Sequence, residues 1–152
     1  MLVRDCMSAH PVTLRPEADL RIALDLMRTH QFHHLPVVDP QGAIVGILAE
    51  RDLLMAALHY SSGTVDVARV MHRQVVTVTP DTPLREAAST MVRRAIGALP
   101  VVSAGRVIGV ITETDLFRAL VTLLDTPRTT GEHDAPVRGV GRGAIPMDVS
   151  AP

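Results

Sequence analysis

Two polar side chains three residues apart, Thr112 and Asp115, have the types and the spacing to hold a ligand through hydrogen bonds. They follow the apolar residues 109–111, a pattern that predicts a strand running into the first turn of a helix, with a polar cap and an acid. In one interpretation they only cap that helix. The pattern recurs at residues 46–52, where Asp52 matches Asp115 and Ala49 stands in place of Thr112. This duplication favours a binding role over a simple cap.

The chemistry available to the chain is binding and not catalysis. The sequence contains no nucleophile–base pair, no Walker-type phosphate loop and no neighbouring carboxylates spaced for acid–base work. His30, His33 and His34 lie close together, but no carboxylate or cysteine completes a metal site with them. We therefore predict that the protein is not an enzyme and has no metal site and no catalytic cofactor.

Composition sets limits on partners and location. The 152 residues carry a formal net charge of −1, so no global field attracts nucleic acid or an anionic membrane. The single cysteine, Cys6, excludes an internal disulfide and fits a reducing compartment. No apolar run is long enough to span a membrane. We expect a cytoplasmic protein without membrane insertion and without nucleic acid as its target.

The whole chain up to about residue 125 is an internal repeat. Residues 3–38 match residues 67–102 at 13 of 36 positions. Downstream, the offset of 64 becomes 63, because the turn at residues 39–42 is one residue longer than the turn at 103–105. Two related units are therefore predicted, at residues 1–60 and 65–125. Residues 126–152 are rich in Gly and Pro and lack periodicity, which predicts a flexible C-terminal tail.

Each unit has the same predicted order of elements: a short helical turn, then strand, helix, strand, strand and helix. In the first unit these are residues 3–7, 11–14, a helix including 20–27, 35–38, 43–48 and 52–59. In the second they are residues 67–71, 75–78, a helix including 84–91, 99–102, 106–111 and 115–124. Thr82 before Pro83 predicts the cap of the helix that includes residues 84–91. The fold class is α+β, with two β-α-β-β-α units that bury their sheets against each other with pseudo-twofold symmetry.

The repeated motifs resemble a known family. Each unit has an apolar-Pro-Val-Val strand, at residues 35–38 and 99–102, and a Gly-apolar-apolar junction that leads to Asp-Leu. The chain resembles a tandem pair of CBS domains, the module named after cystathionine beta-synthase, over residues 1 to about 125. This resemblance implies a regulatory module whose cleft binds AMP, ADP or ATP, with S-adenosylmethionine or NAD as less favoured ligands. It also implies a homodimer, formed through the two terminal helices, and an effector protein that responds to the ligand.

The resemblance assigns expected roles to matching residues. Asp115 and Asp52 match the ribose-binding carboxylates, and Thr112 matches the phosphate-binding hydroxyl. The first unit has Ala49 at that hydroxyl position, where Arg51 offers a substitute phosphate ligand. The basic residues expected before the apolar-Pro pair are His33 and His34. The adenine slot and its flanking threonines are expected among Val12, Thr13, Leu35 and Pro36, or among Val76, Thr77, Ala98, Leu99 and Pro100.

Other interpretations of the same residues stay open. The Thr112–Asp115 and Ala49–Asp52 pairs also suit plain helix starts, and His33 and His34 also suit an exposed surface or a contact between units. Because both sites share one cleft, the histidines of one unit can also contact a phosphate that is bound by Thr112 of the other unit. The alternative function is a scaffold or interaction protein that keeps the fold and has no ligand.

Overall fold

The computed structural model describes residues 1–60 and 63–125. The first unit contains α1 (Leu20–His30), β2 (His34–Val38), β3 (Ile44–Ala49) and α2 (Glu50–His59). The second contains α3 (Leu84–Arg94), β4 (Ala98–Ser103), β5 (Arg106–Thr112) and α4 (Glu113–Asp125). The α+β class with repeated units is confirmed. The predicted tail, residues 126–152, lies outside the described residues.

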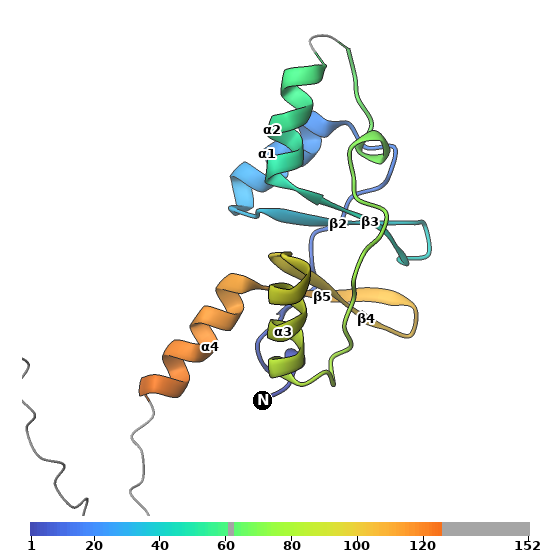
Figure 1. Cartoon of the computed structure of the whole chain (residues 1–152). Coiled ribbons are helices and arrows are strands. Elements are labelled where there is room, and N and C mark those ends of the chain that lie inside the picture. The colour runs from blue at the N-terminus through green and yellow to red at the C-terminus, as the bar shows by residue number, and fades with distance from the viewer. Residues whose placement is uncertain (61–62, 126–152) are drawn as a thin grey trace, which may run out of the picture.

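Two antiparallel hairpins form the centre of the molecule. In the first, β2 pairs with β3 from His34 opposite Ala49 to Val38 opposite Ile44. In the second, β4 pairs with β5 from Ala98 opposite Thr112 to Ser103 opposite Arg106. The hairpins lie next to each other, with α1 and α2 on the outer side of the first and α3 on the outer side of the second (Figure 1). Each unit therefore covers only the outer face of its own hairpin.

The first predicted strand of each unit is much shorter than expected. It forms one parallel bridge, Leu14 with Val37 and Val78 with Val101. Leu14 donates to the Pro36 carbonyl and accepts from Val38. The next bond of a parallel ladder would need an N–H from Pro36, which proline does not have. The proline that marks each Pro-Val-Val strand thus also limits its pairing.

The beginning of each repeat packs into the core of the other unit, which the sequence did not predict. Val3 and Met7 pack with the second core, whereas Val67 and Met71 belong to the first. The two valines lie in the 3-10 helices η1 (Val3–Asp5) and η2 (Val67–Arg69), and the two methionines follow these helices. The short strand β1 (Ser8–Ala9) then pairs with β5. The two units are thereby linked by an exchange of their first segments.

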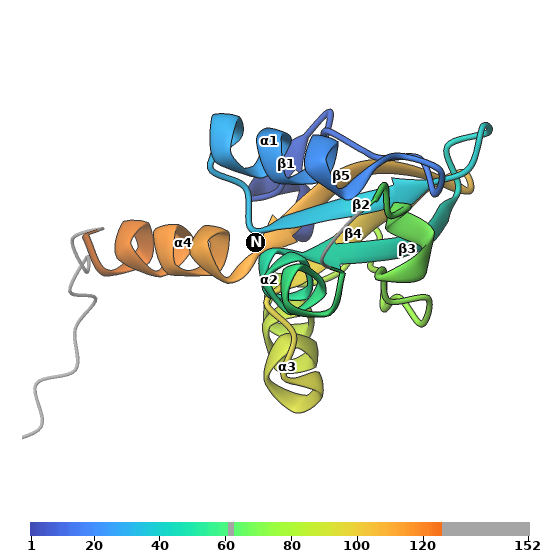
Figure 2. The same ribbon diagram turned by 90° about the horizontal axis from the view of Figure 1, so that it is seen from above.

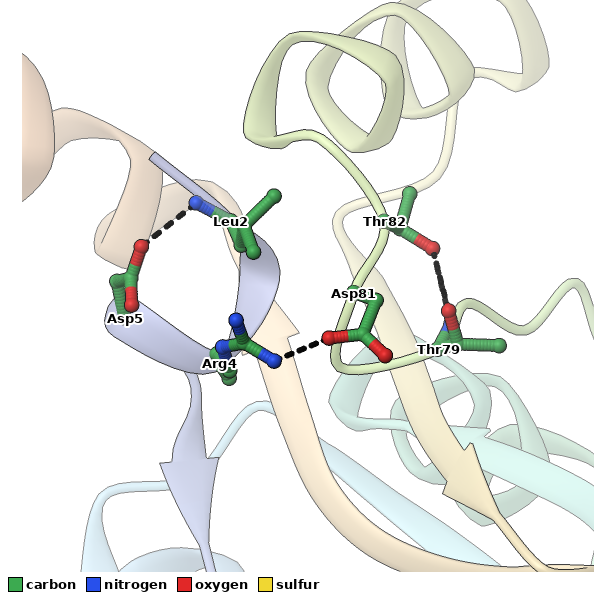
Figure 3. Close-up of polar contacts among 6 residues, drawn as sticks. All are labelled: Leu2, Arg4, Asp5, Thr79, Asp81 and Thr82. Carbon is green, nitrogen blue, oxygen red and sulfur yellow. Dashed lines mark hydrogen bonds and ion pairs between the residues drawn. The ribbon is translucent and has the colours of Figure 1, made fainter.

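Polar contacts hold the first exchanged segment beside the second unit (Figure 3). Arg4 forms an ion pair with Asp81 in the turn before α3, and the Leu2 N–H donates to Asp5. Thr82 does not cap α3 as expected. Its Oγ1 accepts from the Thr79 N–H at 3.0 Å, and α3 begins one residue later, with Pro83 as the N-cap. The threonine therefore stabilises the turn and not the helix.

Gly109 allows the exchanged segment to approach β5 closely. A Cβ atom at Gly109 would lie 2.8 Å from Met7 Sδ and 3.0 Å from the Ser8 carbonyl oxygen. The sulfur can move, but the Ser8 carbonyl belongs to a paired backbone. We expect Gly109→Ala to lower the free energy of unfolding by about 1 to 3 kcal/mol, measured by urea denaturation. The exposed control Ser103→Ala should change it by less than about 0.5 kcal/mol; an equal effect of both would contradict this explanation.

Candidate functional site

A cavity of about 830 Å³ lies where the two units meet. The first unit supplies Val12, His33, His34 and Pro36, and the second supplies Thr112 and Asp115. The structure thus brings together these six predicted site residues from different units. The cavity also has charged lining residues that the sequence analysis did not name: Arg28, Glu50, Glu113 and Arg118.

Asp115 is the buried carboxylate of this cavity. It is 6% exposed and is the one polar side chain that is buried within residues 1–60 and 63–125. Its Oδ2 atom accepts from the Thr112 N–H at 2.9 Å and from the Thr112 hydroxyl at 2.7 Å. Its Oδ1 atom accepts from Arg118 at 3.2 Å. A buried carboxylate that lines a cavity keeps further acceptor capacity for a ligand's hydroxyl groups.

Arg118 was missed by the sequence analysis, although a signal for it existed. It stands three residues after Asp115, a spacing that places both side chains on one face of a helix. Its side chain is 75% exposed. A guanidinium carries five N–H donors, so Arg118 can bind an anion while it still contacts Asp115.

The two histidines have different surroundings. His33 is exposed, and its Nδ1 lies 2.7 Å from Glu50 Oε2. His34 is half-buried and reaches the other unit at Gly97. A Cβ atom on Gly97 would lie 3.3 Å from His34 Cε1 and 3.4 Å from Glu113 Oε2. Because Gly97 has no side chain, the His34 ring can lie beside Glu113 across the boundary between the units.

Burial lowers the pKa of His34, and the neighbouring His33 lowers it further, whereas Glu113, Asp52 and Glu50 partly oppose the shift. A histidine whose pKa is lower in the folded state than the usual value of about 6.5 stays neutral in the folded protein at pH values at which it is protonated in the unfolded chain. The unfolded chain then binds more protons as the pH falls, so stability decreases below about pH 6.5.

This effect gives a pH-dependent prediction. As the pH is lowered from 7.5 to 5.5, we expect the urea concentration at the unfolding midpoint of the wild-type protein to decrease. It should decrease less for His34→Gln, because glutamine does not titrate. The control is His10→Gln at an exposed position, which should leave the pH dependence as it is in the wild type. Equal slopes for the wild type and His34→Gln would contradict the assignment.

Asp52 lies apart from the larger cavity. It lines a smaller one of about 290 Å³ beside Tyr60 and Arg69. Its Oδ2 accepts from the Ala49 N–H at 2.9 Å, and its Oδ1 lies 3.1 Å from His72 Nε2. Both carboxylate oxygens of Asp52, the residue predicted to bind a ribose, thus have partners within the chain.

The other predicted residues do not line the larger cavity. Leu99 and Pro100 are fully buried, Ala98 is buried, and Leu99 packs in the second core. Val76 packs beside that core, and Leu35 lies in the first core. Arg51 and Thr77 are exposed, and Thr13 is half-buried. The predicted slot on the first unit, represented by Val12 and Pro36, is the one that meets Thr112 and Asp115.

Charges of both signs surround the cavity. Arg28 and Arg118 face three carboxylates, Glu50, Glu113 and Asp115, and three histidines add positive charge only when protonated. The carboxylates outnumber the arginines, so each additional negative charge on a ligand meets increasing repulsion. The cavity suits a ligand with hydroxyl groups, a flat apolar part and a small negative charge.

Comparison with protein families finds the CBS domain twice in the chain, at residues 3–59 and 67–122. A CBS domain-containing protein of Dictyostelium discoideum is 32% identical over 137 residues, which cover 82% of this chain and 94% of that protein. Other relatives are longer. The chain spans 42% of the protein MJ1225 of Methanocaldococcus jannaschii, at 33% identity, and 23% of homoserine O-acetyltransferase of Methanocorpusculum labreanum, at 36% identity.

Solved structures show the same architecture. A putative acetoin utilization protein (AcuB) of Vibrio cholerae matches with a TM-score of 0.75 and 37% identity, over 82% of this chain and 93% of that one. The CBS domain pair of MJ0100, in complex with 5′-methylthioadenosine and S-adenosyl-L-methionine, matches with a TM-score of 0.74 and 31% identity, over 81% and 98%. CBSX2 in complex with AMP matches with a TM-score of 0.71 and 26% identity, over 81% and 98%.

Proposed function

The chain belongs to the CBS domain family as a tandem pair, and we propose that it is a non-catalytic regulatory module that binds an adenosine-containing ligand and signals its presence to a partner protein. The observation that carries this proposal is the buried carboxylate of Asp115 in a cavity of about 830 Å³ built from both units. A ligand that contacts both units can change how they sit together, which is the physical basis for a signal.

Each part of an adenosine ligand has a matching group in the cavity. The ribose hydroxyls donate to Asp115, which already accepts from Thr112 and Arg118. The adenine ring lies against Val12 and Pro36 of the first unit. The ligand's phosphate binds the guanidinium of Arg118 or the side chains of His33 and Arg28, which line the same cavity.

Charge favours a monophosphate among these ligands. AMP brings one phosphate to a cavity with two arginines, whereas ADP and ATP bring further negative charge towards Glu50 and Glu113. The ligands in the related structures, AMP in one and S-adenosyl-L-methionine with 5′-methylthioadenosine in another, share the adenosine group and not a polyphosphate. Our proposed order of affinity is therefore AMP, then ADP, then ATP.

Isothermal titration of AMP, ADP, ATP, S-adenosylmethionine and NAD into the purified protein tests this proposal. The preparation is first checked for retained nucleotide by its ultraviolet spectrum, because a chain with no Trp and one Tyr absorbs little itself. AMP binding tighter than ATP binding supports the proposal. Tight binding of S-adenosylmethionine alone keeps the sensor but rejects the nucleotide. If none of the five compounds binds and no ligand is retained, the ligand-binding function is rejected and the scaffold function is favoured.

An exposed apolar face on α4 supports the proposed homodimer, and this surface would also serve the alternative scaffold function. Figure 2 shows α4 extending away from the two hairpins. Phe117, Val121 and Leu124 are 66%, 56% and 75% exposed on it, and such apolar area is typical of a contact surface. Leu53 and Leu116, the first leucines of the two terminal helices, pack against the cores of their own units and do not belong to this exposed face.

We expect light scattering after size exclusion to show a dimer for the wild type and a monomer for Phe117→Asp. A charge at the centre of an apolar interface has to be desolvated without a partner, which weakens association at least about 100-fold. Val92→Asp is the matched control, because Val92 is an 81% exposed apolar residue on α3. A wild-type monomer, or a dimer that persists in Phe117→Asp, would contradict the assigned face.

In residues 1–60 and 63–125, no helix has the length and hydrophobicity needed to cross a membrane. Within the same ranges, no group of three or more His, Cys, Asp or Glu side chains has the geometry to hold a metal ion. The expectations of a cytoplasmic location and of an unknown effector protein stay predictions.

A further inference from the structure

We propose that the first unit contains a second, latent site for the same class of ligand, and that the side chain of His72 keeps this site closed by occupying Asp52. The inference rests on the proposed function, because the latent site is the counterpart of the proposed adenosine site. It predicts one bound ligand per chain, although the internal repeat provides two equivalent positions for one.

The internal repeat identifies the counterpart residues. Asp52 corresponds to Asp115, Ala49 to Thr112, and His72 to Ser8. The backbone pairing agrees with this alignment, since Ser8 lies opposite Val110 on β5 and His72 lies opposite the equivalent residue of β3, Ile47. Ser8 and His72 therefore occupy the same place beside the two carboxylates, but they differ in size and chemistry.

Ser8 leaves the working site open. It lines the larger cavity together with Asp115, and no hydrogen bond joins its side chain to that carboxylate. Asp115 does contact Arg118, but the guanidinium at the end of this long side chain provides further N–H donors for a ligand. The bound ligand can share this arginine with Asp115 without displacing it.

His72 closes the equivalent place on the first unit. Its Nε2 lies 3.1 Å from Asp52 Oδ1, and the Ala49 N–H donates to Asp52 Oδ2 at 2.9 Å. The backbone of His72 is held by two hydrogen bonds to Ile47, both 2.9 Å. The backbone of His72 is thus fixed beside β3, and its imidazole occupies the oxygen that would accept from a ribose hydroxyl.

Two further differences weaken this second site. Ala49 lacks the hydroxyl with which Thr112 supports Asp115, so Asp52 is held at the helix start by one hydrogen bond fewer. Asp52 also lines a cavity of only about 290 Å³, formed with residues of α2 and of the segment around Arg69, and not with the slot residues Val76 and Pro100. Closure by His72 and the loss of the hydroxyl act on the same site, and both can be reversed by substitution.

The test counts AMP molecules bound per chain, by isothermal titration and by mass spectrometry under native conditions, with S-adenosylmethionine as the second probe. The wild type should bind one. The double variant His72→Ser with Ala49→Thr, which copies Ser8 and Thr112, should bind a second molecule. The reciprocal variant Ser8→His places an imidazole beside Asp115 and should lower affinity at the working site about tenfold or more.

The outcomes separate this inference from the proposed function. A wild type that binds neither probe rejects the proposed function and this inference together. A wild type that binds two molecules leaves the function intact and overturns the closure by His72. A double variant that still binds one, or a Ser8→His variant with unchanged affinity, also overturns it. Ser8 and His72 are both exposed, and the melting temperature of each variant shows that the fold is kept.

Discussion

Asp115→Ala is expected to lower the affinity for AMP about 10- to 100-fold. The carboxylate is buried at the cavity, and a hydrogen bond to a charged group contributes about 1.5 to 3 kcal/mol. The substitution also leaves the Thr112 N–H and hydroxyl without their acceptor. Loss of this helix-start contact should lower the free energy of unfolding by about 1 kcal/mol. Titration calorimetry measures the first effect and urea denaturation the second.

The repeat supplies a matched control for this experiment. Asp52→Ala removes the equivalent carboxylate, which accepts from the Ala49 N–H at the start of α2. It should therefore cost similar stability, but it should leave AMP affinity within about twofold, because Asp52 does not line the larger cavity. If Asp115→Ala kept its affinity, the ribose assignment would be wrong. If both variants lost affinity equally, the effect would come from the fold and not from the cavity.

Local patterns made most elements of the fold predictable. The apolar stripe through Leu20, Ala23 and Met27 indicated α1, and the Pro-Val-Val strands followed by a Gly turn indicated the hairpins. Every one of these signals lies within about ten residues of chain, where backbone geometry dictates the period of apolar positions. The short helical turns predicted at residues 3–7 and 67–71 correspond to the 3-10 helices Val3–Asp5 and Val67–Arg69.

Which strand residues face the cavity was not predictable in the same way. Residues 98–101 are all buried, so the strand shows no alternation that would separate a core side from a ligand side. Leu99 therefore looked like part of an adenine slot, although it packs in the second core. The place of Thr112 and Asp115 was easier to predict, because polar side chains at the end of a buried strand must find hydrogen-bond partners close by.

Contacts between the repeats were also beyond the sequence signals. Val3 and Val67 are identical residues at equivalent positions of the repeat, so their pattern says that both are buried but not in which unit. The pairing of His72 with Asp52 joins residues 20 apart that share no periodicity. Arg118 at i+3 from Asp115 is the exception, because helical spacing predicts that contact.

The exchange of first segments leads to the second large effect. Val3 is fully buried in the second core, where it packs with Leu99 and Ile111. Val3→Asp places an unpaired carboxylate among these apolar side chains, and we expect it to lower the free energy of unfolding by about 3 to 5 kcal/mol. The damage should appear far away in the sequence, in β4 and β5, and less in β2 and β3.

Amide hydrogen exchange measures this distribution, because it reports local opening for each strand. The matched variant Val67→Asp should show the reverse pattern, with the greater loss of protection in β2 and β3, since Val67 packs in the first core with Leu35 and Leu48. Loss of protection in the variant's own sequence repeat would reject the exchange. Crossed protection patterns would show that each unit needs the beginning of the other repeat to complete its core, which ties the two halves of the proposed ligand cavity into one cooperative structure.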